Sequence, residues 1–502
     1  MSKFVNAMNN ATNYAVTENG ALTHKTTRSD LLDMFAMGAA MRKRSNEDVI
    51  LMWRKAYAEN PVYALKCLFY IRDIRGGQGE RRFFRVCLAD LAKQDVEAAR
   101  RNLQYVAEFG RWDDLYVFVG TALEKDALQI MKDQLTLDVQ CKTPSLLAKW
   151  LKSENTSSAE SRRLGNITRE FLGMSHKQYR KTLSILREKI NILERLMSEN
   201  RWDEIEFDKI PSKAGMKYKN AFARRDIIKA KYAAFAKDET KTVNAKALYP
   251  YECVAEAMNV MGYAGRWSSY GRSVALDDTN RLMVNKYWDN LADYFNGKPF
   301  SGMAVVDTSG SMCGSEAAAP INVAISLGMY CAEKAQGPFH NHFITFSSNP
   351  TWVQVEGVDF CDKVQRMTKA DWGNSTNVEA AFDLILNTAI RSGCSPDEIP
   401  QNLIVISDME FNSCATSRGY GRPDNTLFEK IAAKFAAHGY KMPHMIFWNV
   451  DARQNNIPML GNGPISYVSG MSPTIFETIL SGKTGYDLMM EKLNTERYNC
   501  IQ

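Results

Sequence analysis

Residues 301 to 312 read SGMAVVDTSGSM, a short apolar run that ends at Asp307 and is followed by Ser309 and Ser311. An Asp-x-Ser-x-Ser pattern after a strand offers one carboxylate and two hydroxyl oxygens, at every second residue, on a turn that can fold them around one point. Mg²⁺ prefers oxygen ligands in octahedral geometry and keeps several waters, so few protein groups suffice. The motif predicts a divalent cation site. Taken alone, it also suits a turn whose Ser hydroxyls cap a helix start.

Two later segments place polar side chains at comparable positions. Residues 373–377, Gly-Asn-Ser-Thr-Asn, precede an amphipathic helix that is expected to start near Val378. Residues 403–408, LIVISD, form a second buried-strand run that ends in a carboxylate, Asp408. Ligands of open α/β sheets bind at the carboxyl ends of the strands. The three loops therefore predict one shared site.

In their order and residue types these loops resemble the metal-ion-dependent adhesion site of the von Willebrand factor A (vWA) fold. The resemblance implies that Thr376 and Asp408 join Asp307, Ser309 and Ser311 as metal ligands. It also implies a bound divalent ion, for which we expect Mg²⁺, with Mn²⁺ or Ca²⁺ as alternatives.

The remainder of the C-terminal part predicts alternating strands and helices. Such alternation is typical of a mostly parallel sheet covered on both faces. We therefore expect residues 299–502 to form one α/β domain of the vWA type, with a last helix near residues 486–497 that packs elsewhere. The expected strands lie at 343–346, 442–450 and 465–468, and the expected helices at 321–334, 378–391 and 426–438.

Length and composition limit the class of protein. A chain of 502 residues is too long for a single core. No run of eighteen apolar residues is present, so we expect no membrane span, and the N-terminus lacks the apolar segment of a secretory signal. The ten cysteines are scattered, with no C-x-x-C pair, and Cys67 and Cys87 are expected in the core. A reducing, cytoplasmic location is the simple expectation.

Charge divides the chain into two unequal parts. Residues 1–300 contain 49 Lys and Arg against 37 Asp and Glu, whereas residues 301–502 contain 14 against 20. The net charges are therefore +12 and −6. A basic half favours a polyanionic partner, although ordinary proteins also reach an excess of this size.

The basic half is predicted to be helical. From residue 28 to residue 240, apolar residues recur at spacings of three and four, connections are short and strand signals are scarce. Helical hairpins that stack into a HEAT-like solenoid are the expected architecture for residues 1–298. Clear examples are residues 29–42, 45–59, 61–72, 79–93 and 95–109.

Three segments of this half combine basic and aromatic side chains, which can neutralise phosphates and stack on unpaired bases. Residues 72–85 (RDIRGGQGERRFFR) form either a phosphate-binding loop before a helix or a plain helix break. Residues 175–189 and 211–232 are either nucleic-acid contacts or solvated helix faces with core aromatics. The candidate contact residues are Arg75, Arg81, Arg82, Lys177, Arg180, Lys181, Lys217, Lys219, Arg224 and Arg225.

A basic helical half followed by a vWA-like domain resembles the Ro/TROVE family of RNA-binding proteins. It resembles more closely an uncharacterised relative of that family found in eukaryotes and viruses, including phages. The segments that carry the resemblance are FYIRDIRGGQGER (69–81), FGRWDDL (109–115), LGMSHKQYRKTLSILR (172–187), RWDEIEFDKIPSKA (201–214), VVDTSGSM (305–312) and VISDMEF (405–411).

That resemblance implies a helical ring that binds single-stranded or structured RNA and is closed by the vWA domain. No arrangement of nucleophile and base is visible, so we expect a non-enzymatic, RNA-binding protein. The alternative is a protein-interaction scaffold, in which the vWA metal completes its coordination with an Asp or Glu of a partner protein.

Overall fold

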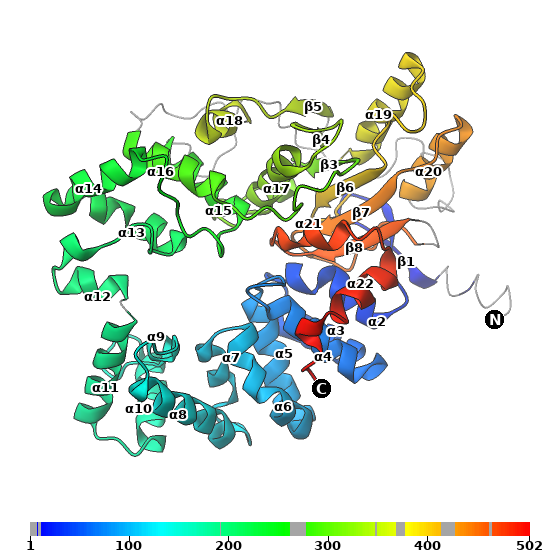
Figure 1. Cartoon of the computed structure of the whole chain (residues 1–502). Coiled ribbons are helices and arrows are strands. Elements are labelled where there is room, and N and C mark those ends of the chain that lie inside the picture. The colour runs from blue at the N-terminus through cyan, green and yellow to red at the C-terminus, as the bar shows by residue number, and fades with distance from the viewer. Residues whose placement is uncertain are drawn as a thin grey trace.

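The computed structural model describes residues 8, 12–190, 192–261, 278–346, 349–367, 377–412, 427–460 and 464–502. Within these ranges, the helices are the regular secondary structure of residues 30–289, whereas residues 302–469 contain a six-stranded sheet with helices between its strands. The predicted fold class, a helical part followed by an α/β part, is confirmed at this level. Figure 1 shows both parts.

The helices of the first part agree with the predicted segments, and differ from them mainly where turns of 3₁₀ helix interrupt. The expected helix at 95–109, for example, is divided by a 3₁₀ turn at Leu103–Tyr105. The helices are α2 (Asp30–Met37), α3 (Asn46–Glu59), α4 (Pro61–Arg72), α5 (Arg81–Gln94), α6 (Val96–Asn102), α7 (Val106–Phe109), α8 (Glu124–Gln140), α9 (Leu147–Trp150), α10 (Ala159–Phe171), α11 (His176–Lys189), α12 (Leu193–Ser198), α13 (Ser212–Arg224), α14 (Asp226–Lys237), α15 (Pro250–Val260) and α16 (Asp278–Asp289).

Local sequence signals set where these helices begin. Helix α4 starts at Pro61, directly after Asn60, whose side chain accepts a hydrogen bond from the amide of Tyr63. Helix α11 starts after Ser175, which forms a capping box with Gln178. Such caps satisfy amides that have no partner within the helix.

The sheet of the second part has the strand order β5-β4-β3-β6-β7-β8. All neighbouring pairs are parallel except β4 and β5. The predicted strands and helices are present, and β5, α18 and α21 are additional. The elements are β3 (Gly302–Asp307), β4 (His342–Phe346), β5 (Thr351–Gln354), β6 (Asn402–Ser407), β7 (His444–Asn449), β8 (Ile465–Ser469), α17 (Pro320–Lys334), α18 (Phe360–Met367), α19 (Val378–Ser392), α20 (Leu427–Ala437), α21 (Thr474–Ile479) and α22 (Gly485–Leu493).

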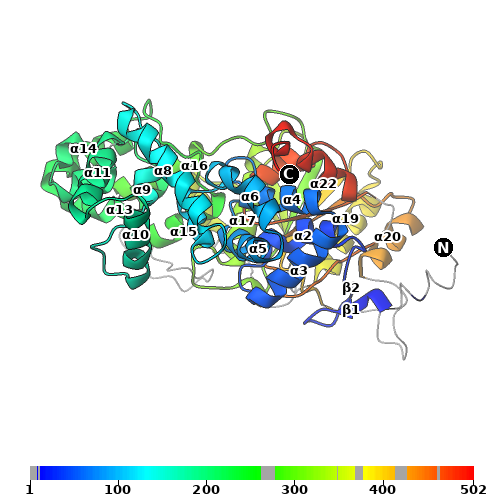
Figure 2. The same ribbon diagram turned by 90° about the horizontal axis from the view of Figure 1, so that it is seen from below.

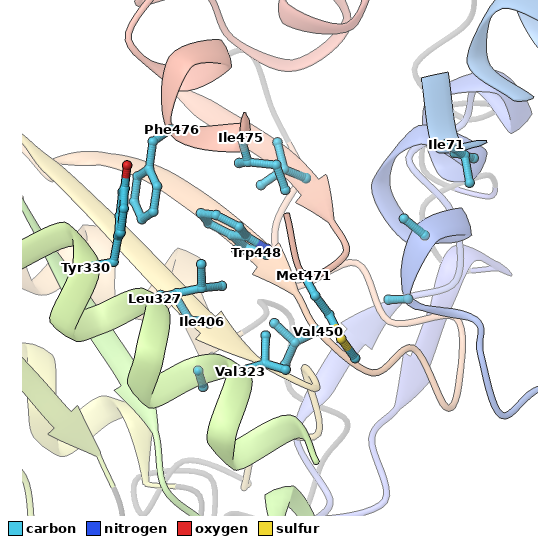
Figure 3. Packing of buried hydrophobic residues seen from close by; sticks show 14 of the residues in the cluster. Ile71, Val323, Leu327, Tyr330, Ile406, Trp448, Val450, Met471, Ile475 and Phe476 are labelled. Carbon is cyan, nitrogen blue, oxygen red and sulfur yellow. The ribbon is translucent and has the colours of Figure 1, made fainter. Parts of the chain in front are cut away.

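The core of the second part lies between this sheet and its helices. The ring of Trp448 meets the ring of Phe476 edge to face at 5.0 Å, and Tyr330 of α17 stacks on Phe476 at 5.3 Å. Figure 3 shows these rings beside Leu327 and Ile406. Strands β3 and β6 are buried along nearly their whole length, as expected for parallel strands covered on both faces. The sheet is therefore a rigid frame for the side chains at its edge.

The helices of the first part run in an arc that leaves the sheet at one side and returns to it at another. Helix α2 packs against β8, and α15 and α16 pack against α17 and α18. Figure 1 shows the arc running out through α8 to α12 and back through α13 to α16, and Figure 2 shows that its far part lies to one side of the sheet.

The Gly-Gly-Gln-Gly turn after α4 joins the ends of this arc to the sheet domain. The carbonyl of Gln78 accepts a hydrogen bond from the Tyr249 hydroxyl at 3.2 Å, and the carbonyl of Gly77 accepts one from the Thr474 hydroxyl at 3.0 Å. A Cβ on Gly77 would lie 2.0 Å from the carbonyl oxygen of Tyr70, so no larger residue fits there. The turn therefore connects the two ends of the helical arc with the sheet domain.

Two segments from the ends of the chain pack against the part of the protein that is distant from them in sequence. A short antiparallel hairpin, β1 (Tyr14–Val16) and β2 (Leu22–His24), lies on the loops that follow β6 and β7. Helix α22, which overlaps the last helix expected from the sequence, packs against α2 and α4. No pattern in the sequence predicted this hairpin. We call residues 12–26 the N-terminal hairpin below.

Candidate functional site

The carboxyl ends of β3 and β6 meet at the point where the sheet changes direction. From β3 the chain builds β4 and β5 on one side, and then β6, β7 and β8 on the other. In open α/β sheets the crevice at such a switch point is the usual ligand site. Asp307 ends β3 and Asp408 follows β6 directly, so the fold brings together two of the predicted metal ligands.

Asp307 is fully buried and held by two hydrogen bonds. Its Oδ1 accepts from the Ser309 amide at 2.9 Å, and its Oδ2 accepts from the Ser407 hydroxyl at 2.6 Å. The hydroxyls of Ser309 and Ser311 lie 3.0 Å apart. One carboxylate and two hydroxyls therefore lie close together in the loop that follows β3, and their role as metal ligands stays a prediction.

Asp408 is also buried, and both of its carboxylate oxygens are engaged. Oδ1 accepts from the Glu410 amide at 3.1 Å, and Oδ2 forms an ion pair with the guanidinium of Arg453. The same guanidinium pairs with Glu18 of the N-terminal hairpin at 3.1 Å. Thr376, the remaining predicted ligand, lies outside the described residues.

The carboxylates at this edge are poorly solvated and close to one another. Burial, together with the charge of Asp408, raises the pKa of Asp307 to about 7. Burial, with smaller contributions from Glu18 and Asp408, raises the pKa of Glu410 to about 7. Desolvation and like charges both disfavour the ionised form, so a cation bound here would relieve both costs.

The donor set fits a small divalent cation that keeps several waters. Among the described residues, no three or more His, Cys, Asp or Glu side chains are grouped to hold a metal. A site of one carboxylate with hydroxyl oxygens does not need such a group, because Mg²⁺ is commonly held by one or two carboxylates and water. The guanidinium on Asp408 also shows that this carboxylate accepts a positive partner.

The predicted nucleic-acid contacts divide into two sets. In the first, the side chains are exposed and available. Lys177, Arg180 and Lys181 of α11, together with Arg81 and Arg224, are exposed and make no hydrogen bond or ion pair through their side chains with any described residue. Lys217 is exposed above the ring of Tyr218, at 4.8 Å, and Arg225 lies over Trp202 at 4.7 Å.

In the second set the side chains serve the fold. Arg82 donates to the carbonyl of Arg44 and to the Asn46 side chain, both at 2.7 Å. Lys219 forms an ion pair with Glu256. Arg75, although exposed, donates to the carbonyl of Glu108 at 2.7 Å. These contacts reduce what the three residues can offer to a ligand.

Two aromatic residues of the segments 175–189 and 211–232 are unavailable for base stacking. Tyr179 and Phe222 are both 0% exposed, because they lie on the apolar faces of α11 and α13. Tyr218 is only partly buried, and its hydroxyl donates to Glu194 at 3.2 Å. Stacking by Tyr179 or Phe222 is therefore excluded by their burial, and Tyr218 is the aromatic side chain of these segments that a base can reach.

A hollow of about 630 Å³ lies beside α11 and α12. Arg180 and Arg187 both line this hollow. The Arg187 side chain is held in place because its guanidinium donates hydrogen bonds to the carbonyls of Ala148 and Leu151 at 2.8 and 3.0 Å. The charged residues that line the hollow are Lys149, Glu154, Arg180, Arg187, Glu194, Arg195 and Glu199.

Sequence reasoning missed three residues near the two carboxylates: Arg453, Glu18 and Ser407. Arg453 follows β7, so the rule that ligands gather at carboxyl ends could have placed it at this edge. Glu18 comes from a hairpin about 390 residues earlier in the chain, and no local pattern indicates where that hairpin docks.

Further described features bear on the expected surroundings of the protein. No helix in the described ranges combines the length and the apolar composition needed to cross a bilayer. The described cysteines are free thiols, and Cys67 and Cys87 are 0% exposed, which confirms their predicted place in the core.

Comparison with protein-family models gives two matches. Residues 17–170 and 145–297 match a family described as a domain of unknown function (DUF2828), and residues 301–499 match a second domain of unknown function (DUF7788). The two matches lie on either side of residue 299.

Comparisons with individual proteins give a viral relative and a solved structure. The uncharacterized protein L728 of Acanthamoeba polyphaga mimivirus is 31% identical over 520 residues, which cover 94% of this chain and 85% of that protein. The crystal structure of the Deinococcus radiodurans RO (RSR) protein matches with a TM-score of 0.49 and 15% identity, over 91% of this chain and all of that one.

Proposed function

We propose that this protein, which belongs to the family described as a domain of unknown function (DUF2828) and is homologous to the mimivirus protein L728, is a non-enzymatic RNA-binding protein. In this proposal the exposed cations of the helical arc contact the phosphates of RNA. The α/β domain is of the vWA type and binds one divalent ion, with Mg²⁺ expected, at Asp307, Ser309, Ser311, Thr376 and Asp408.

The observation that carries the RNA proposal is the set of exposed, unpaired cations on α11. Neighbouring arginines are used inside the protein: Arg169 pairs with Glu154 at 2.7 Å and Arg195 with Glu199 at 2.6 Å. Lys177, Arg180 and Lys181 are exposed and have no such partner among the described residues. Cations left unpaired on a basic surface are suited to phosphate, which binds largely through such charges.

Charge reversal on α11 tests this proposal. The triple variant Lys177→Glu, Arg180→Glu and Lys181→Glu is expected to bind a mixed-sequence single-stranded RNA oligonucleotide at least about tenfold more weakly at 100 mM salt. Because each neutralised phosphate adds about 0.7 to the slope of log affinity against log salt, the slope should fall by about 2. Fluorescence anisotropy across a salt series measures both quantities.

A matched control carries the same charge change elsewhere on the helical part. Lys55→Glu, Lys93→Glu and Lys125→Glu reverse three exposed lysines of α3, α5 and α8 and should leave the affinity nearly unchanged. Failure of the unaltered protein to bind RNA at about 50 mM salt, or a flat salt series, would favour the alternative function. That alternative is a protein scaffold whose metal site binds an acidic residue of a partner.

The metal proposal predicts a pH dependence. A divalent ion binds the ionised carboxylate, so protons compete with it at Asp307. Because the pKa of Asp307 is raised to about 7, Mn²⁺ affinity should be about tenfold higher at pH 8 than at pH 6. Titration calorimetry with Mn²⁺ at the two pH values checks this, and equal affinities would contradict it.

A further inference from the structure

We propose that Arg453 is an internal counter-ion that competes with the divalent ion for Asp408, and that it couples metal binding to docking of the N-terminal hairpin. The inference rests on the metal site proposed above. It goes beyond that proposal because it assigns a role to a residue outside the donor set, and a partner segment to the site.

The position of Arg453 makes it a bridge between the hairpin and the sheet edge. One terminal nitrogen pairs with Asp408 and the other with Glu18, at 3.1 Å. The Asp408 side chain is 0% exposed, whereas that of Glu18 is 42% exposed. The guanidinium therefore has one end in the buried edge and the other at the surface.

The hydrogen bonding of the Arg453 side chain is incomplete. Its Nε is buried and has no hydrogen-bond partner among the described residues. A buried donor without a partner carries an uncompensated desolvation cost, so this position of the guanidinium is less favourable than a fully satisfied one. Arg453 is consequently suited to move away when a divalent ion binds the carboxylate of Asp408.

Competition follows from the way Asp408 is occupied. The Glu410 amide holds Oδ1 at 3.1 Å, and Arg453 holds Oδ2. A divalent ion beside Asp307 that uses Asp408, directly or through water, would have to share this carboxylate with a guanidinium of the same sign. Like charges in a poorly solvated site repel strongly, so each cation weakens the hold of the other on Asp408.

The hairpin depends on the same few residues. The Glu18 amide donates to the Glu410 carboxylate at 2.7 Å, and the Thr17 hydroxyl donates to the Phe411 carbonyl at 2.6 Å. Both acceptors lie within three residues of Asp408. A change in the Arg453 bridge is therefore transmitted to the turn of the hairpin by direct contacts, without a longer path through the fold.

Coupling between two binding events is reciprocal, and here it gives opposite signs for two variants. Arg453→Gln removes the competing charge, so Mn²⁺ should bind about fivefold more tightly or better. Glu18→Gln removes one of the two acidic partners of Arg453, so the guanidinium then pairs with Asp408 alone. Mn²⁺ should therefore bind about threefold more weakly. Simple loss of structure would weaken binding in both variants.

The experiment is a titration of the full-length chain with Mn²⁺ at pH 8, followed by calorimetry. Arg44→Gln is the matched control, because Arg44 contacts the same loop through Asn455 at 2.8 Å without touching Asp408, and it should stay within about twofold of the unaltered protein. Arg453→Lys keeps the charge and should also stay close to the unaltered protein.

A second measurement does not depend on the magnitude of metal affinity. Amide hydrogen exchange at Glu18, Ala21 and His24 reports docking of the hairpin. Exchange should be faster in metal-free Arg453→Gln than in the unaltered protein, and adding Mn²⁺ to the unaltered protein should accelerate it at the same amides.

The outcomes separate this inference from the metal site itself. If the unaltered protein binds Mn²⁺ and Arg453→Gln binds it equally or more weakly, Arg453 is not a competitor and the metal site stands alone. An equal gain in Arg44→Gln would mean general electrostatics and would also overturn the inference. If neither the unaltered protein nor any variant binds Mn²⁺, the metal site and the inference fall together.

Discussion

Replacing Asp307 with Asn is expected to abolish binding of Mn²⁺ and, in the absence of metal, to stabilise the protein at pH 8. Asn has the same shape and keeps hydrogen-bonding groups toward the Ser309 amide and the Ser407 hydroxyl, which now bind the carboxylate at 2.9 and 2.6 Å. What it removes is the charge, which is the part that binds metal and that is disfavoured by burial.

The sign of the stability change follows from the pKa. In the unfolded chain Asp307 has its ordinary pKa of 3.8, and burial raises it to about 7 in the folded protein. The stability that protonated Asp307 contributes to the folded protein is therefore fully present below pH 4. The free energy of unfolding then decreases as the pH rises from 4 through 7. A shift of this size corresponds to up to about 4 kcal/mol at pH 8, which Asp307→Asn should recover.

Thermal unfolding of the metal-free proteins across pH 4 to 8 checks the result. The two curves should coincide near pH 4 and separate above it, with the variant more stable. Asp451→Asn is the control on the same edge, since Asp451 pairs with Lys43 at 3.0 Å and is not a predicted ligand. It should retain Mn²⁺ affinity. Unchanged Mn²⁺ affinity in Asp307→Asn would remove the metal assignment.

The parts of this site that could be predicted from sequence are those that depend on the residues of one short segment. Asp307 and Asp408 each end a run of apolar residues, and parallel strands align their carboxyl ends at one edge, so two separate motifs predict one location. Ser309 and Ser311 follow Asp307 within one turn and needed no long-range information. The same reasoning correctly predicted β3, β6 and β7, whose apolar runs are continuous.

The parts that could not be predicted depend on contacts between distant segments. The N-terminal hairpin has strands of only three residues, too short to show a clear alternation, and its docking on the loop after β6 is a property of the folded chain. The partnership of Glu18 with Arg453 therefore has no signature in the sequence. Local patterns also could not distinguish the exposed Lys177 from Lys219, whose partner Glu256 is on another helix.

Residues 72–85 show how burial separates two interpretations of one motif. The sequence allowed a phosphate-binding loop or a helix break. In the structure Arg72 is 2% exposed and pairs with the fully buried Asp114 at 2.7 Å, and Arg85 binds the other oxygen of Asp114 at 2.6 Å. These contacts, with those of the adjoining turn, favour a structural role for most of the arginines in this segment.

Arg72→Met is therefore expected to destabilise the protein strongly. Removing one partner of a buried ion pair leaves the other charge poorly compensated, which costs about 3 to 5 kcal/mol in measured cases. Urea unfolding followed by circular dichroism measures the change. Arg163→Met is the matched control, because Arg163 pairs with Glu160 at the same distance of 2.7 Å but with both side chains exposed, where such pairs contribute little.

The same variant also tests the phosphate-binding interpretation. A structural role for Arg72 requires that RNA affinity, measured under conditions where Arg72→Met is still folded, equals that of the unaltered protein, because a side chain 2% exposed has no surface to offer a phosphate. If Arg72→Met instead unfolds at the same urea concentration as the unaltered protein but binds RNA more weakly, then the Gly-Gly-Gln-Gly turn must open to bind RNA. Arg72 would then be a ligand contact, and its pair with Asp114 would be the resting state of that contact.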